Sequence, residues 1–142
     1  MSKTFYAERI KDMLLLIARI LMVLLFVIFG WQKLTNYSGT VAYFAQGNVP
    51  LPPLSAAIAI IAELGAGIAI ALGIVTRPVA VLLALYTFAT ALLGHHYWTM
   101  LGPARAEAEI NFFKNISIVA GLFLLYLTGA GRYSIDDKMN LG

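Results

Sequence analysis

The chain has 142 residues, of which 61% are hydrophobic and 12% charged, whereas soluble domains carry about 25% charged residues. This balance excludes an ordinary water-soluble domain and favours a membrane protein, because the apolar residues form four blocks of about 20, enough to cross the bilayer as helices. The chain has no cysteine, which excludes disulfide bonds and thiolate-ligated zinc or iron–sulfur clusters. Its net charge of +3 comes from scattered basic residues, a distribution that argues against nucleic-acid binding.

The sequence predicts an all-α, single-domain membrane protein, a four-helix bundle with helices at about 13–34, 54–75, 78–96 and 110–129. The first apolar run is longer than that of a signal peptide and no small-residue cleavage site follows it, so we interpret it as a retained helix. The link Thr76-Arg77 before Pro78 is so short that helices two and three must form an antiparallel hairpin, and proline is favoured at a first helical position.

Two longer connections, residues 35–53 and 97–109, must lie on the same side of a four-span protein. Residues 41–45 in the first connection, after a candidate cap at Ser38, are compatible with a short helix lying in the membrane interface or with a plain loop. Basic residues near the span ends set the orientation. Both termini are predicted to be cytoplasmic, because that side carries Lys3, Arg9, Lys11, Arg77, Arg132 and Lys138.

Three charged side chains are the strongest cases of a charge inside a predicted span: Arg19, Glu63 and Lys114. A charge at mid-bilayer costs roughly 2.5–3.5 kcal/mol even on insertion scales, so each one needs a partner or a function. We expect Glu63 to pair with Arg19 or with Lys114, and the sequence leaves open which. Alternatively, these groups line a polar cavity for an anionic or carbonyl-bearing ligand, or relay protons. Lys33 lies nearer the outer edge, where its side chain can snorkel to water.

Helical spacing brings further polar residues to one outer mouth if the polar faces all point inward. This mouth would contain Gln32, Lys33, Asn36, His95, His96, Asn111, Lys114 and Asn115. We predict no metal there, because adjacent residues diverge by about 100° around a helix, which prevents His95 and His96 from readily sharing an ion. In the second helix, Gly65 and Gly67 are predicted to let neighbouring helices approach closely.

Several segments in order resemble the DoxX family of small four-helix inner-membrane proteins, and the resemblance covers nearly the whole chain. These segments are Arg19-Ile20, Phe29-Gly30-Trp31-Gln32-Lys33-Leu34, Glu63-Leu64 with Gly65 and Gly67, Gly73-Ile74-Val75-Thr76-Arg77-Pro78, Ile110-Asn111-Phe112-Phe113-Lys114-Asn115 and Gly129-Ala130-Gly131-Arg132-Tyr133-Ser134-Ile135-Asp136. The segment Gly94-His95-His96-Tyr97-Trp98 is similar to one inner-membrane subgroup.

For some members, the resemblance implies association with quinone-linked oxidoreductases. We therefore expect an accessory or quinone-site subunit, not itself an electron carrier or catalytic on its own, with an oxidoreductase as partner. The residues that would form the ligand site or a buried polar network are Arg19, Lys33, Glu63, His95, His96, Asn111, Lys114 and Asn115. The alternatives are a binding or transport protein for a small anionic or lipid-like ligand, and a structural assembly factor. The small residues of the second helix also allow a homodimer, or packing within one chain.

Overall fold

The computed structural model describes residues 3–142, and within them four helical spans are long and apolar enough to cross a membrane. The elements are α1 (Lys3–Thr35), α2 (Tyr37–Gln46), α3 (Pro52–Ile60), η1 (Ile61–Ala66), α4 (Gly67–Leu72), α5 (Thr76–Gly94), η2 (Tyr97–Thr99), α6 (Pro103–Thr128) and α7 (Ile135–Lys138). The second span is composite, because α3, the π-helical η1 and α4 run on as one continuous rod. The predicted all-α architecture of four spans is confirmed.

Two of the spanning helices are longer than their apolar blocks. α1 begins at Lys3 where residue 13 was expected, and α6 begins at Pro103 where residue 110 was expected. Hydropathy marks only the part of a helix that meets lipid, whereas the helix itself continues through polar residues of good propensity. Proline at the first position of α6 explains its early start, since that amide would have no helical partner.

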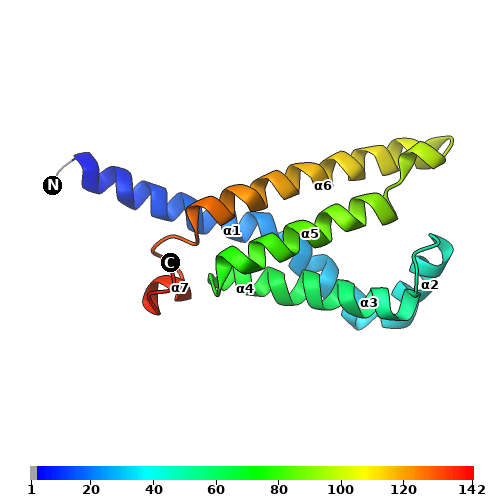
Figure 1. Ribbon diagram of the computed structural model, residues 1–142, viewed down its shortest axis with the longest axis horizontal. Coiled ribbons are helices and arrows are strands. Elements are labelled where there is room, and N and C mark those ends of the chain that lie inside the picture. Colours follow the sequence, from blue (N-terminus) through cyan, green and yellow to red (C-terminus); the bar gives the residue numbers. More distant parts are fainter. Residues whose placement is uncertain (1–2) are drawn as a thin grey trace.

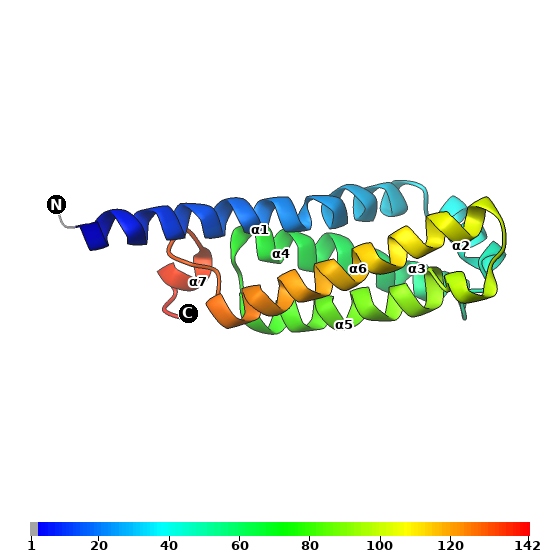
Figure 2. The same ribbon diagram turned by 90° about the horizontal axis from the view of Figure 1, so that it is seen from above.

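The four spans form an elongated bundle with the chain's two ends at the same end of the long axis (Figures 1 and 2). We call this the terminal end; the opposite loop end carries α2, η2 and the start of α6. α2 confirms the helical interpretation of residues 41–45, but its cap is Asn36, whose Oδ1 accepts the Gly39 amide at 3.3 Å, and not Ser38. Which end faces the cytoplasm stays a prediction from the basic residues.

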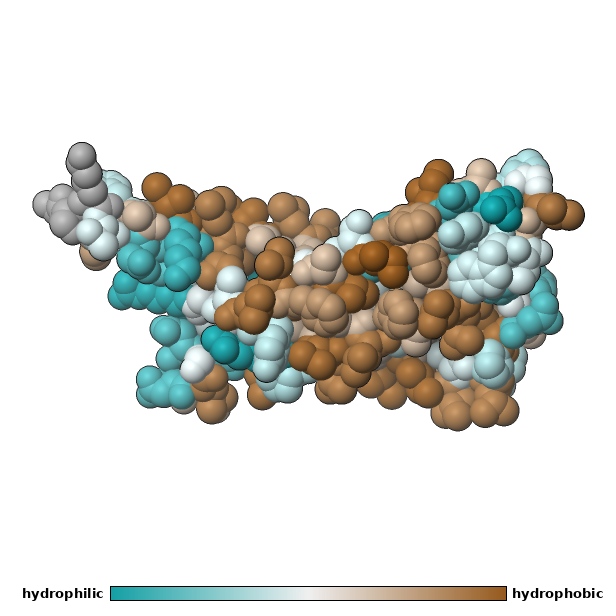
Figure 3. Space-filling view, turned by 45° about the horizontal axis from the view of Figure 1, so that its top comes forward, coloured by the Kyte–Doolittle hydropathy of each residue, from teal (hydrophilic) through white to brown (hydrophobic). Residues whose placement is uncertain are grey.

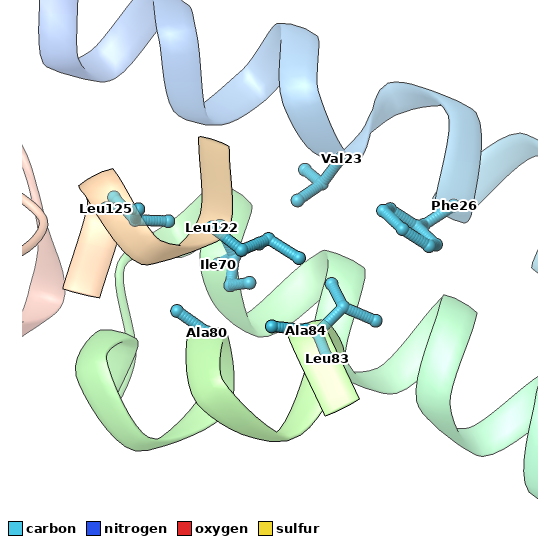
Figure 4. Packing of buried hydrophobic residues seen from close by; sticks show 8 residues of the cluster. All are labelled: Val23, Phe26, Ile70, Ala80, Leu83, Ala84, Leu122 and Leu125. Atoms are coloured by element: carbon cyan, nitrogen blue, oxygen red, sulfur yellow. The ribbon is translucent and has the colours of Figure 1, made fainter. Parts of the chain in front are cut away.

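A buried apolar cluster joins all four spans (Figure 4). Its members are Val23 and Phe26 of α1, Ile70 of α4, Ala80, Leu83 and Ala84 of α5, and Leu122 and Leu125 of α6. In lipid there is little hydrophobic drive between helices, so close packing must hold them. Ala56, Ala59 and Gly67 of the second span are also buried, which places these small residues inside the chain. The prediction of a close helix approach was wrong for Gly65, which is exposed and where an added Cβ would meet nothing within 4 Å.

The outer surface is an apolar belt between two polar ends (Figure 3). Large apolar side chains point outward from each span, among them Leu21, Ile61, Leu82 and Leu124, all more than 60% exposed. Exposure on this scale is typical of side chains that meet lipid. The belt matches the four apolar blocks of the sequence.

Candidate functional site

A cluster of three polar side chains lies between three spans, and we call it the loop-side cluster: Lys33 of α1, Glu63 of η1 and Tyr86 of α5. Lys33 Nζ donates to Glu63 Oε2 at 2.7 Å, and Tyr86 Oη donates to Glu63 Oε1 at 2.6 Å. The Lys33 and Glu63 side chains are 21% and 11% exposed. One membrane carboxylate therefore holds donors from two neighbouring helices, one on each oxygen.

Local backbone structure positions this carboxylate. Glu63 lies inside the π-helical segment η1, and such segments are rare and frequent at functional sites. Gly30 of α1 lies directly against it, because a Cβ added at Gly30 would lie 2.7 Å from Leu64 N and 3.1 Å from Glu63 Cβ. The missing side chain lets α1 touch η1. Lys33, one turn after Gly30, then reaches the carboxylate.

The expected partner of Glu63 was wrong: it is Lys33, and neither Arg19 nor Lys114 forms an ion pair with it. Counting residues along each helix predicts how deep each side chain lies in the membrane. It does not predict how the helices are rotated or how closely they approach each other. Arg19 is 1% exposed and turns toward the terminal end, where its guanidinium donates to the backbone carbonyls of Ala71 and Tyr133 at 3.1 and 2.9 Å and to that of Ala130.

The remaining residues of the predicted outer mouth are divided among three environments. Asn115 is buried and its Nδ2 donates to Thr90 Oγ1 at 3.1 Å, which links α6 to α5. Lys114 is exposed, and its Nζ donates to Asn111 Oδ1 at 3.1 Å on its own helix. Lys33 joins the loop-side cluster instead of extending to water. The mouth is therefore not one shared vestibule of hydrogen-bonded groups.

His96 lies beside an aromatic group at the loop end, and the backbone carbonyl of His95 accepts the Tyr97 amide at 2.8 Å. His96 Nδ1 is 3.0 Å from Leu93 O, and its ring meets Trp98 edge-on at 6.3 Å. The aromatic group continues through Tyr97, Phe112 and Phe113 in edge-to-face and tilted contacts. In the described part of the chain, no three His, Asp or Glu side chains are placed to hold a metal ion.

A second polar network closes the terminal end. The Asp136 carboxylate accepts the amides of Val75 and Thr76 at 2.6 and 2.8 Å, and its own amide donates to Gly73 O at 2.8 Å. Burial alone would raise the pKa of Asp136, but the hydrogen bonds from the Thr76 and Val75 amides and the nearby Arg19 charge bring it below its ordinary value. This network ties the segment after α6 to the α4–α5 turn and to α1.

The sequence analysis assigned no role to Tyr86 or to Asp136. A phenol in the middle of a span needs a hydrogen-bond partner. This requirement could have predicted that Tyr86 pairs with Glu63, the one acid inside the predicted spans. Ser134-Ile135-Asp136-Asp137 has the spacing of a helix cap, and Ser134 Oγ does accept the Asp137 amide at 3.1 Å. That signal marked a short structured segment after the last span.

Chemically, the loop-side cluster offers donors in a membrane-embedded setting. A lysine ammonium has three N–H groups, so Lys33 keeps donors beyond the one that Glu63 accepts. Lys114 adds a further cation, with Glu63 and Lys33 among its charged neighbours. The arrangement suits hydrogen-bond acceptors such as carbonyl or anionic oxygens.

Comparison with known proteins places these features in a family. The DoxX family model matches residues 14–96. Inner membrane protein YphA of Escherichia coli (strain K12) is 50% identical over 128 residues, covering 90% of this chain and 91% of the relative. Inner membrane protein YqjF of the same organism is 39% identical over 136 residues, covering 94% and 97%.

A more distant relative is the ER-derived vesicles protein ERV29 of Saccharomyces cerevisiae (strain ATCC 204508 / S288c). It is 26% identical over 134 residues, which are 94% of this chain but only 36% of that protein. No solved structure matches the chain. The family match, the two inner-membrane relatives and the four apolar spans agree with one another. The chain therefore belongs to the DoxX family and is a multi-pass protein of the bacterial inner membrane.

Proposed function

We propose that this protein is an accessory subunit of a quinone-linked oxidoreductase and that the loop-side cluster contributes a quinone-binding site. The observation that carries the proposal is the Glu63 carboxylate, held inside a π-helical segment by Lys33 at 2.7 Å and by Tyr86 at 2.6 Å. Buried charged groups in membrane spans mark functional sites by default. This cluster joins three helices, and its lysine and glutamate side chains are 21% and 11% exposed.

The donor set fits the chemistry of a quinone. A quinone presents two carbonyl oxygens, which accept hydrogen bonds, on an apolar ring. Lys33 has spare N–H groups, and the exposed Lys114 ammonium donates within the described residues only to Asn111. Glu63 balances one of the two cations. These residues would hold the head group, and the bound quinone would supply the redox chemistry.

The accessory role follows from what this chain lacks in its composition. Without cysteine it has no thiol and no thiolate-ligated cluster to carry electrons. Electrons would then reach the quinone from an oxidoreductase partner, and this chain would bind and orient the head group. Four candidate spans account for most of the chain, which agrees with an anchoring subunit.

The test is a thermal-unfolding titration of purified protein with a short-chain quinone. A ligand at 100 times its dissociation constant stabilises the folded state by about 2.7 kcal/mol. We expect the quinone to stabilise the wild type. It should stabilise the matched control Tyr126→Phe equally, and it should no longer stabilise Tyr86→Phe. Tyr126 is 45% exposed on α6 and forms no hydrogen bond within the described residues.

A second candidate is binding of a small anionic or lipid-like molecule at the same cluster, favoured by Lys114, which forms no ion pair within the described residues. An anion that stabilises the wild type where the quinone does not, and that fails to stabilise Lys114→Gln, would support this candidate instead. A purely structural role predicts that Glu63→Gln lowers the unfolding temperature while no quinone or anion raises it. A homodimer remains a separate prediction, testable by mass in a native detergent extract.

A further inference from the structure

A polar cleft of about 330 Å³ opens at the terminal end, far from the loop-side cluster. We call it the terminal cleft; its lining includes Asp12, Arg77, Gly129, Gly131, Arg132 and Asp137. These residues come from α1, the start of α5 and the segment after α6. Since α5 begins at Thr76 and α6 ends at Thr128, the cleft lies where the spans end. This is the depth at which lipid head groups meet a membrane protein.

Two arginines of the cleft are unpaired. Arg77 and Arg132 are exposed, and within residues 3–142 neither guanidinium forms an ion pair or a hydrogen bond. The Arg77 guanidinium lies over Gly129, where an added Cβ would be 3.2 Å from one of its terminal nitrogens. Guanidinium groups are well suited to phosphate, which they bind with two parallel hydrogen bonds.

The same cleft carries negative charge beside the arginines. Asp12 Oδ1 accepts the Arg132 amide at 3.3 Å, and Asp137 is exposed with no ion pair inside the described part of the chain. A cleft of both signs is poorly matched to a simple anion, because the carboxylates would repel it. It is well matched to a zwitterion that has a phosphate and an ammonium a few bonds apart.

An apolar groove continues from the cleft along α1. It is open and shallow, and one face of α1 forms it: Ala7, Ile10, Lys11, Leu14, Leu15 and Ala18. Leu15 joins the two features, because its Cδ1 lies 3.0 Å from the position of a Cβ at Gly131, which lines the cleft. Polar cleft and apolar groove together have the shape and chemistry of one amphiphile site.

We propose that the terminal cleft binds an aminophospholipid. Its phosphate lies between Arg77 and Arg132, its ammonium group faces Asp12 and Asp137, and an acyl chain follows the α1 groove past Leu15. This site is independent of the proposed function of the loop-side cluster. It predicts that the protein distinguishes phosphatidylethanolamine from phosphatidylglycerol, which has the phosphate but lacks the amine.

The test is native mass spectrometry of delipidated protein in detergent, titrated with phosphatidylethanolamine, phosphatidylglycerol and free phosphoethanolamine. For the wild type we expect phosphatidylethanolamine to bind at least tenfold more tightly than the other two. Arg77→Gln combined with Arg132→Gln should weaken it at least tenfold. The control with the same charge change, Arg9→Gln combined with Lys138→Gln, alters two terminal-end cations outside the cleft lining and should leave binding unchanged.

Asp137→Asn is a second test variant, in which both arginines are kept. It should bring the affinity for phosphatidylethanolamine to that for phosphatidylglycerol. The proposal is overturned if the two lipids bind the wild type equally, which would show ordinary lipid contact. It is also overturned if phosphoethanolamine binds as tightly as the lipid, or if the arginine pair and its control variant have equal affinities.

Discussion

Replacing Gly30 with alanine tests how closely α1 must approach η1. The added Cβ would lie 2.7 Å from Leu64 N and 3.1 Å from Glu63 Cβ. The first distance is shorter than real Cβ contacts, and the second is shorter than most of them. Both neighbours are at the helix backbone and cannot swing away, so α1 must move outward. Overpacking of this kind costs about 1–3 kcal/mol. The shift also lengthens the 2.7 Å Lys33–Glu63 contact.

The measurement is reversible or thermal unfolding in detergent micelles, with Gly65→Ala as the matched control. Gly65 is a helical glycine in η1 itself, but a Cβ there would meet nothing within 4 Å. Alanine at such a site should stabilise the helix by about 0.5–1 kcal/mol. The two substitutions therefore shift stability in opposite directions. If Gly30→Ala unfolds at the wild-type temperature or above, the close approach described here is incorrect.

Three further predictions concern the packing and the two polar networks. Lys33→Met should destabilise the fold by about 3 kcal/mol, because it leaves Glu63 buried without its cation, and adding Glu63→Gln should restore most of the loss in a double-mutant cycle of unfolding free energies. The lowered pKa of Asp136 contributes stability that is complete above the ordinary carboxyl value of about 3.9 and is lost as pH falls through the lower folded value. The unfolding temperature of the wild type should therefore fall as the pH is lowered below about 4. Asp136→Asn should be less stable than the wild type at neutral pH, and its unfolding temperature should change less with pH over that range. Leu122→Ala, at a side chain that is 0% exposed, should cost about 2–5 kcal/mol through the cavity it leaves, and an equal loss in Leu124→Ala, which faces lipid, would contradict the packing.

The four spans could be predicted because block length alone decides whether an apolar segment crosses the bilayer. The extension of α1 back to Lys3 could not, because residues 3–12 are mixed in polarity and only their contact with the bundle and the membrane decides their state. The π-helical turn at Glu63 leaves no mark in hydropathy or periodicity. A single π-helical turn changes the direction in which every later side chain of that span points.

The partners of the membrane charges were harder to predict than the charges themselves. The two terminal nitrogens of Arg19 donate to backbone carbonyls of the segment after α6, and no pattern of side chains signals such acceptors. Glu63 pairs with Lys33 because Gly30 lets α1 contact η1. That contact depends on how the helices are rotated, and the depth of each residue in the membrane does not reveal it. Sequence spacing orders groups along one helix but does not fix how two helices meet.

The most direct test of the proposed function is the quinone content of the protein extracted gently from its native membrane into nanodiscs. The account predicts quinone at close to one molecule per chain in the wild type and in Tyr126→Phe, and its loss in Tyr86→Phe, with all three proteins folded to the same extent. Wild-type protein without quinone, or equal quinone in Tyr86→Phe and Tyr126→Phe, would contradict it.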